Sequence, residues 1–301
     1  MSSSIQPDVV CIGAVLWDII ARAPTEMHAG ADVPGRIKRL PGGVAMNVAV
    51  TLRRFGLTPT LLTAIGRDPE GDDLVTACTR LGLHADFVHR SADLPTDCYL
   101  AIEDPRGLVG AVADAHSLES AGAAILQPLE DGRLGTAQSP WPGLIVLDGN
   151  LTTALLSDIA HSPLFAAADL RVAPASPGKA ERLLPLLGHA GVTLYVNLEE
   201  AGLLCGLRFE NSAEAARALL ARGARRVLVT DGGRECCDGR AGEGLLLGQP
   251  RQVGVNRVTG AGDTFMAAHL AAERRGLARQ AALDTALSAA ADYIAGEHCA
   301  P

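Results

Sequence analysis

The sequence lacks an excess of positive charge and any long hydrophobic run. Lysine and arginine together number 26 against 34 aspartates and glutamates, so the formal net charge is −8. This balance argues against a nucleic-acid backbone or an anionic membrane as the main partner. No stretch approaches the roughly 18 uncharged apolar residues of a membrane helix, and the N-terminus has no basic segment followed by an apolar one. We therefore expect a globular, cytoplasmic protein.

The cysteines form no pattern of paired metal ligands or bridges. There are seven, an odd number, and the sequence has neither a C-x-x-C pair nor a histidine at zinc-finger spacing. We expect reduced thiols and no structural metal held by the protein. The neighbouring residues Cys236 and Cys237 are expected in a polar turn.

Several catalytic signatures are also missing. The chain has no G-x-x-x-x-G-K-[ST], no G-x-G-x-x-G after its first apolar run, no H-R-D with D-F-G, and no G-x-S-x-G. P-loop enzymes, NAD-type oxidoreductases, protein kinases and serine hydrolases therefore lose support.

Short apolar runs of strand length alternate with longer segments of helical period. The runs are DVVCIGAVL, TLLTAIG, LIVLD, LRVAP, TLYVN and RVLVTDG, and residues 44–55 have one apolar helical face. This alternation predicts an α/β fold with a mostly parallel central sheet covered by helices. With 301 residues and 48% hydrophobic residues, we expect one domain over 1–301 with a sizeable core.

Two segments depart from the alternation. Residues 17–40 and 96–113 read as short strands and a turn with no intervening helix, which predicts a small separate sheet. A small sheet that projects from a large α/β domain suggests a lid. Its exposed edges leave open a homodimer that covers them.

The stretch VTGAGDTF joins small residues to an acidic one where a helix is expected to begin. The amides of Gly260, Ala261 and Gly262 at a helix N-terminus form a place for an anion such as phosphate. Asp263 is either a helix cap or a general base acting on a bound hydroxyl. Read alone, the stretch favours the cap.

Ligands of open α/β sheets bind beyond the carboxyl ends of the strands, so polar residues and glycines that follow apolar runs are candidates for a site. They are Asp18, Gly42, Gly43, Asn47, Asp148, Asn150, Asn197, Thr230, Gly232 and Gly233. Asn47 lies near a helix start beside two glycines and off the apolar face, where its amide either binds ligand hydroxyls or caps the helix.

Three further stretches have both a functional and a structural interpretation. Asn197 and Glu200 either form a capping box or hold a hydrated Mg²⁺ through water. The turn with Thr230, Gly232 and Gly233 either cradles a nucleotide phosphate or closes a hairpin. Lys179 stands at a helix start, where the helix dipole disfavours lysine unless an anion is near.

Taken in order, the motifs IGAVLWD, PGGVAMNVA, GRDPEG, NLEEA and VTGAGDTF resemble the ribokinase-like PfkB family of carbohydrate and nucleoside kinases over nearly the whole chain. The resemblance implies a sandwich with a small β lid, ATP as phosphoryl donor, and Mg²⁺, and it leaves open K⁺ near the glycine loop. The implied roles are a base at Asp263, an anion hole at 260–262, an acceptor site at Asp18, Gly42, Gly43 and Asn47, and nucleotide or Mg²⁺ contacts at Lys179, Asn197, Glu200, Thr230, Gly232 and Gly233.

Within the family, VLDGNLT, ASPGKAERLLPLL, VNRVTGAGD, and Thr96 with Tyr99 look most similar to pseudouridine kinases. The partner implied is a small-molecule nucleoside phosphorylated on its ribosyl 5′-hydroxyl. The same reaction on a free sugar such as ribose or fructose, or on another nucleoside, is the alternative. A binding protein that kept the fold without activity is a further rival, against which the retention of Asp263 and its glycine loop argues.

Overall fold

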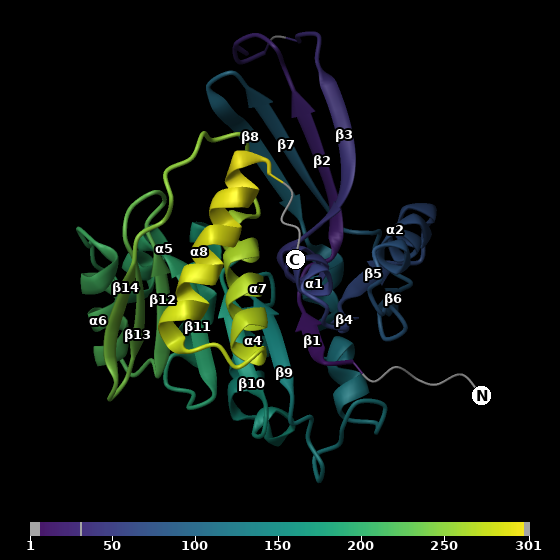
Figure 1. Cartoon of the computed structure of the whole chain (residues 1–301). Coiled ribbons are helices and arrows are strands. Elements are labelled where there is room, and N and C mark those ends of the chain that lie inside the picture. Colours follow the sequence, from purple (N-terminus) through teal and green to yellow (C-terminus); the bar gives the residue numbers. More distant parts are fainter. Residues whose placement is uncertain (1–6, 31, 298–301) are drawn as a thin grey trace.

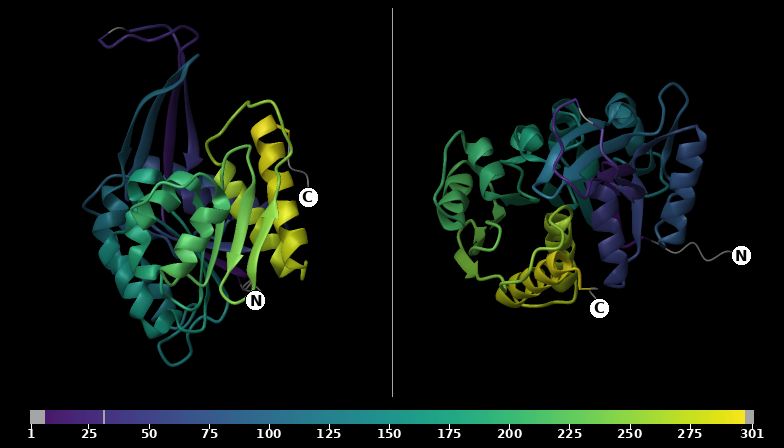
Figure 2. Two further views of the ribbon diagram at one scale, coloured as in Figure 1. Left: turned by 90° about the vertical axis from the view of Figure 1, so that its left-hand side faces the viewer. Right: turned by 90° about the horizontal axis from the view of Figure 1, so that it is seen from above.

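The computed structural model describes residues 7–30 and 32–297 (Figure 1). The predictions for Cys299 and for the two ends of the 1–301 domain lie outside these residues. The chain forms a large sheet covered by helices on both faces and a smaller sheet that projects from one edge of it (Figures 1 and 2). Within the described ranges, no helix combines the length and the apolar composition needed to cross a membrane.

The large sheet has the strand order β14-β13-β12-β11-β10-β9-β1-β4. Its strands are β1 (Val9–Ile12), β4 (Pro59–Leu62), β9 (Leu144–Asp148), β10 (Asp169–Ala173), β11 (Val192–Asn197), β12 (Arg226–Thr230), β13 (Cys236–Arg240) and β14 (Gly244–Gly248). The first six are parallel, and β13 and β14 add an antiparallel edge. The mostly parallel α/β architecture predicted from the alternation is confirmed.

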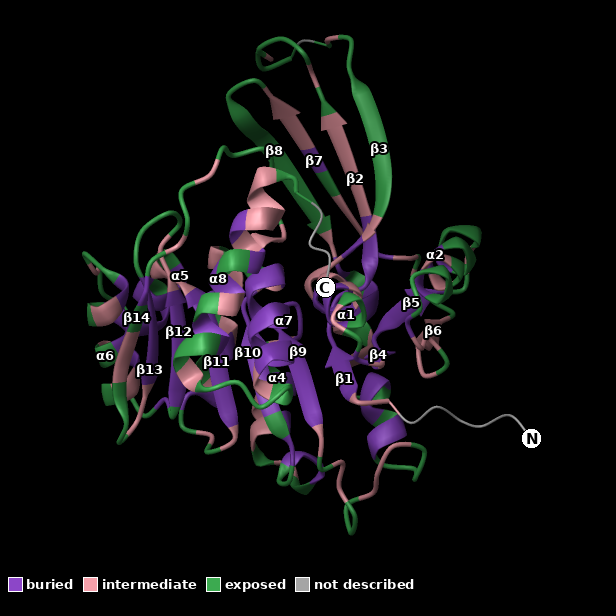
Figure 3. Cartoon of the chain, viewed as in Figure 1, coloured by how far each residue is buried: buried purple, intermediate pink, exposed green. Residues whose placement is uncertain are grey.

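Helices cover both faces of this sheet. They are α1 (Val44–Arg54), α2 (Pro69–Arg80), α3 (His116–Ala121), α4 (Thr153–His161), α5 (Leu198–Cys205), α6 (Ser212–Ala221), α7 (Ala261–Arg274) and α8 (Arg279–Ala295), with 3₁₀ turns η1 (Gly122–Leu129), η2 (Pro163–Phe165) and η3 (Pro177–Leu186). Alternate residues of β9 enter different cores: Ile145 packs with α4, α5 and α6, and Val146 with α1, α7 and α8. Burial of both faces explains why the strands are continuous apolar runs (Figure 3).

The smaller sheet has the order β3-β2-β7-β8. Its strands are β2 (Leu16–Arg22), β3 (Arg36–Gly42), β7 (Cys98–Asp104) and β8 (Gly107–Asp114), so both predicted segments contribute to it. β2 begins four residues after β1 ends, which places this sheet at the carboxyl edge of the large one. The predicted smaller sheet is confirmed.

The base of the smaller sheet is fixed to the start of α2. The Trp17 indole N–H donates to the carbonyl of Glu70, and the Asp68 carboxylate accepts from the amide and the hydroxyl of Thr96, just before β7. Asp68 also caps α2 by accepting from Gly71 N–H. The orientation of the smaller sheet is therefore set at α2.

Two local expectations are wrong. The run TLLTAIG is not one strand, since it divides into β4 in the large sheet and β5 (Ala64–Gly66), which pairs with β6 (His89–Ser91) in a two-stranded sheet. Cys236 and Cys237 do not lie in a polar turn but in β13, where both are buried. The reason is that the turn closes two residues earlier, so the cysteines become the first strand residues after it.

Candidate active site

Two helix N-termini meet at the carboxyl edge of the large sheet. Asn47 in the first turn of α1 donates through Nδ2 to Asp263 Oδ2 in the first turn of α7, at 2.9 Å. The two residues are 216 positions apart in the sequence and both are half-buried. Folding therefore joins the predicted acceptor-binding amide to the predicted base.

The start of α1 is set by a glycine and a buried aspartate. Gly43 has φ +96°, and a Cβ there would stand 2.3 Å from the carbonyl oxygen of Ala14. The carboxylate of Asp148, at the end of β9, accepts from the amides of Ala14 at 2.8 Å and Ala45 at 3.1 Å. Asp148 thus ties the end of β1 to the start of α1.

The organising role of Asp148 is one that sequence reasoning missed. A signal was present, because LIVLD is an apolar run that ends in an acid. Such an acid must find donors once it is buried, and Asp148 is fully buried. Here backbone amides supply those donors, while burial still raises its pKa.

Asp18 on β2 lies against the glycine pair. A Cβ on Gly42 would stand 2.0 Å from Asp18 Oδ2, so any larger residue would displace this carboxylate. Burial raises the pKa of Asp18 to about 6. The predicted set Asp18, Gly42, Gly43 and Asn47 is therefore assembled in one place.

The electrostatic setting of Asp263 suits a base. Burial raises the pKa of its carboxyl to about 7; the hydrogen bond from Asn47 opposes this rise, and the negative charges of Asp148 and Asp18 add to it. Its carboxylate accepts from no backbone amide within the described part of the chain, so it does not cap α7. The sequence allowed Asp263 to be a helix cap or a general base, and the structure shows that it is not the cap.

The glycine loop before Asp263 is held by α8. Gly260 is the N-cap of α7 with φ +89°, and a Cβ there would stand 2.6 Å from the hydroxyl of Tyr293. That hydroxyl donates to the carbonyl of Thr259 at 2.8 Å. The Ala261 amide donates to the Val258 carbonyl, whereas the Gly262 amide has no backbone acceptor among the described residues.

Asn197 and Glu200 form the capping box at the start of α5. The backbone amide of Asn197 donates to Glu200 Oε2 at 2.8 Å, and the backbone amide of Glu200 donates to Asn197 Oδ1 at 2.9 Å. Burial raises the pKa of Glu200 to about 7, to which the charges of Glu199 and Asp263 contribute.

The turn that follows Thr230 closes a hairpin, which is the structural one of its two interpretations. Thr230 ends β12 beside Asn197 on β11, and the chain then turns through Gly232 into the antiparallel strand β13, which makes this turn a hairpin. The carbonyl of Gly233 accepts from the Gln252 side chain at 2.8 Å. Among the described residues, no hydrogen bond links this turn to Asp263.

Lys179 in η3 is held by a neighbouring amide. Its Nζ donates to Asn150 Oδ1 at 2.6 Å, just beyond β9. Burial lowers the pKa of its ammonium group, and the charge of Arg182 lowers it further. Within the described ranges, no three histidine, cysteine or acidic side chains gather as a metal site.

Comparison with known proteins identifies the family. Residues 6–298 match the pfkB family carbohydrate kinases. The pseudouridine kinase of Escherichia coli K12 is 27% identical over 266 residues, which cover 86% of this chain and 81% of that protein. The fructoselysine 6-kinase of the same strain is also 27% identical over 266 residues, covering 85% and 90%.

A solved structure shares the fold. The ribokinase of Arabidopsis thaliana, determined in complex with ribose and ATP, superposes with a TM-score of 0.74 at 19% identity, covering 96% of this chain and 93% of that one. The motif order, the carboxyl-edge site and the family match agree. The chain belongs to the pfkB family of carbohydrate kinases and is a phosphotransferase with a hydroxyl group as acceptor.

Proposed function

We propose that this kinase transfers a phosphoryl group from ATP to the primary 5′-hydroxyl of a ribosyl compound, with pseudouridine as the favoured acceptor. The observation that carries the proposal is the Asn47–Asp263 pair between two helix N-termini. The similarity to the E. coli pseudouridine kinase supports the choice of acceptor.

Asp263 is the proposed base. A carboxylate with a pKa of about 7 is a stronger base than an ordinary aspartate and is still half ionised at neutral pH. It takes the proton of the acceptor hydroxyl as that oxygen attacks the γ-phosphorus of ATP, and the bond from this phosphorus to the bridging oxygen breaks so that ADP leaves. Asn47 holds the carboxylate in place through its amide.

The start of α7 is the proposed anion hole. Phosphoryl transfer depends on alignment and on stabilising charge on the phosphoryl oxygens. The unpaired amide of Gly262 and the positive end of the α7 dipole are suited to this, with Gly260 and Ala261 shaping the loop. The Ala261 amide would have to leave the Val258 carbonyl to join them.

Asp18, Gly42, Gly43 and Asn47 are the proposed acceptor site. The Asp18 carboxylate accepts hydrogen bonds from sugar hydroxyls, and the glycines let the sugar approach the backbone. The close packing of Gly42 on Asp18 fixes that carboxylate. The Thr96 hydroxyl is used in a hydrogen bond to Asp68. In the smaller sheet we therefore propose Tyr99, which pairs in register with Asp18, as a contact for the nucleobase of the acceptor.

ATP and Mg²⁺ are assigned to the edge formed by α5 and the β12–β13 turn. Glu200 Oε2 is used in the capping box, while Oε1 accepts no hydrogen bond given for the described residues, so it can bind a water of hydrated Mg²⁺. The ion would screen the charge of the nucleotide phosphates. Asn197, Thr230, Gly232, Gly233 and Lys179 are the proposed nucleotide contacts, and K⁺ near the glycine loop stays a prediction.

An ADP-release assay tests the acceptor. Pseudouridine, uridine, adenosine, ribose, fructose and fructoselysine are compared at equal concentration with ATP and Mg²⁺. We expect the highest kcat/KM with pseudouridine. A preference for fructoselysine or a free sugar would reject the pseudouridine assignment and keep the family reaction, whereas no ADP release with any acceptor would favour a silent binding protein.

The smaller sheet is the proposed lid and dimer surface. Its outer apolar face, defined here as Ile19, Ile37, Leu100, Ile102 and Val112, lies opposite to the face that carries Asp18. Ile37 is 75% exposed and Val112 67%. We propose that a second copy covers this face. A cytoplasmic location stays a prediction from the sequence.

A further inference from the structure

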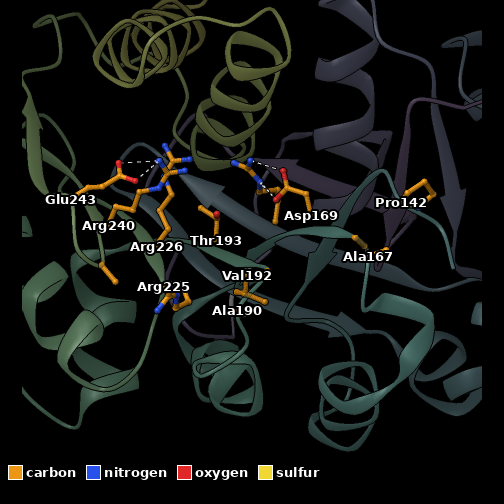
Figure 4. A pocket seen from close by; sticks show the side chains of 14 residues that line it. Pro142, Ala167, Asp169, Ala190, Val192, Thr193, Arg225, Arg226, Arg240 and Glu243 are labelled. Atoms are coloured by element: carbon orange, nitrogen blue, oxygen red, sulfur yellow. Dashed lines mark hydrogen bonds and ion pairs between the residues drawn. The ribbon is translucent and has the colours of Figure 1, made fainter.

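A cavity opens at the edge of the large sheet opposite to the candidate active site. It has a volume of about 520 Å³ and lies where β10, β11 and β12 begin, with the end of β13 beside them (Figure 4). The proposed active site lies beyond the carboxyl ends of these parallel strands. The cavity at the amino ends is therefore a separate place, with no role in the reaction proposed above.

A row of polar side chains crosses four adjacent strands at this edge. Arg171 on β10 pairs in register with Thr193 on β11, Thr193 with Arg226 on β12, and Arg226 with Arg240 on β13. Figure 4 shows Arg226, Arg240 and Glu243 together on one side of the cavity and Asp169 on the other. In register, Arg171 pairs on its other side with the apolar Val146 on β9, so the polar row is confined to β10, β11, β12 and β13.

The two buried arginines are held by Asp169, which lines the cavity, and by two carboxylates outside the lining. Arg171 forms a two-bond pair with Asp169 and also donates to Glu273 at 2.6 Å, while Arg226 donates to the other oxygen of Glu273 and to Asp238. Each guanidinium nevertheless keeps one N–H without a partner among the bonds described. The forks are oriented before any ligand arrives.

The lining carries more positive than negative charge. Four arginines, Arg171, Arg225, Arg226 and Arg240, face two carboxylates, Asp169 and Glu243. Arg240 pairs with Glu243 through Nη1 alone, which leaves its Nε and Nη2 groups, and Arg225 has no ion pair among the residues described. When Asp238, Glu273 and the Arg279 paired with Asp238 are included, five arginines face four carboxylates, and the remaining positive charge attracts small anions.

We propose that this cavity is a second ligand site, which takes a small metabolite carrying a phosphate ester. Guanidinium groups bind phosphate through paired N–H donors, and the hydroxyl of Thr193 adds a donor on the cavity wall. The volume is within the range of small-molecule sites and exceeds what one phosphate fills, so the rest of the metabolite fits as well.

The bound ester has a direct connection to the helix of the proposed base. Glu273, which both buried arginines contact, stands in the last turn of α7, ten residues after Asp263 or about 15 Å along the helix. A phosphate bound to the remaining N–H groups of Arg171 and Arg226 shares both guanidinium groups with Glu273. Occupancy therefore acts on the anchoring of α7.

An NMR titration with inorganic phosphate tests the proposal on the full chain at constant ionic strength. We expect saturable shifts of the backbone amides of Gly191, Val192 and Ala241, which line the cavity. The active site can bind phosphate too, and its amides at 260–263 report on that event separately. The double variant Arg225→Gln/Arg240→Gln is expected to raise the Kd for phosphate, measured from the shifts of the cavity amides, about tenfold or more, because charge-assisted hydrogen bonds are lost.

The matched control is Arg80→Gln/Arg208→Gln, which removes two exposed arginines that have no ion pair in the described part of the chain. Its cavity Kd should equal that of the unchanged protein. Folding of both variants is checked by Tm. The proposal is overturned if phosphate shifts no cavity amide saturably, or if the two double variants bind equally well, since the arginines would then be a structural network alone.

Discussion

At the scale of single residues, the main feature of the site is a group of three carboxylates that are partly or fully buried. Asp263 feels the charges of Asp148 and Asp18, and each of the three has a raised pKa, with burial as the largest cause. Asp148 compensates with backbone donors, whereas Asp263 has one amide side chain, Asn47. Asp18 accepts no hydrogen bond from the described residues, so of the three carboxylates Asp148 is the one that backbone donors stabilise.

Asp263→Asn is expected to lower kcat by about 10²–10⁴, because the amide cannot accept the hydroxyl proton. Its fold should persist, since Asp263 accepts only the Asn47 bond among the described residues. An ADP-release assay measures the loss, and nucleotide binding by calorimetry is the control. Turnover near that of the unchanged protein would contradict the role of Asp263.

The same substitution is expected to change stability in a pH-dependent way. A carboxyl whose pKa rises from 3.8 unfolded to about 7 folded binds more protons in the folded state, so unfolding free energy falls as pH rises between these values. Asp263→Asn removes this penalty. Thermal unfolding should show equal stability near pH 4 and a gain of ~1–3 kcal/mol at pH 8. An equal difference at both pH values would disagree with the raised pKa.

Asn47→Ala is expected to move the pH profile. The Asn47 bond favours the charged form of Asp263, so its removal raises the pKa of that carboxyl. The kcat of the unchanged kinase should rise with pH through about 7, and the inflection should move upward by about one pH unit in the variant. An unmoved inflection would show that another group sets the profile. A higher KM alone would report only lost acceptor binding.

At the scale of elements, α7 is fixed at both ends. Its first turn is joined to α1 through Asn47, and its last turn to β10 and β12 through Glu273, which pairs with Arg171 and Arg226. Nine consecutive residues between these ends are buried, Thr264 to Ala272. Packing in the middle and polar contacts at the ends together position Asp263.

Glu273→Gln is expected to destabilise the protein by ~2–4 kcal/mol, because two buried arginines lose part of their compensation. Burial pushes the pKa of Glu273 up, but the charges of Arg171, His269 and Arg226 hold it below its usual value. Its stabilisation is therefore present above about pH 4.5 and lost as pH falls further. Glu130→Gln, at an exposed glutamate, is the control in urea unfolding; equal effects of the two variants would refute the anchoring role.

At the scale of the whole molecule, the outer strands β3 and β8 of the smaller sheet are exposed (Figure 3), and they carry the apolar residues Ile37 and Val112 that the described part of the chain leaves uncovered. If a second copy covers the outer apolar face, Ile37→Lys/Val112→Lys should shift a dimer to a monomer in sedimentation velocity. Leu207→Lys, at a residue 59% exposed between α5 and α6, is the control and should leave the assembly unchanged. A monomeric unchanged protein would refute the dimer.

Much of the site could be predicted because its residues lie near the carboxyl edge of the large sheet. Asp18, Gly43 and Asp263 were found by their position after apolar runs or at helix starts, and the parallel fold brings such positions to one edge. The capping roles of Asn197 and Glu200 were also open from the sequence. The division of TLLTAIG between two sheets could not be predicted, since strand propensity does not specify a partner.

The sequence by itself determined the α/β class, the smaller sheet and the order of the motifs, because burial period and turn residues are local properties of the chain. Only the tertiary structure decided that Asp263 bonds to Asn47 and does not cap α7, and that Asp148 joins β1 to α1. These contacts link residues more than 100 positions apart. Their geometry depends on how helices pack on the sheet, which no local pattern specifies.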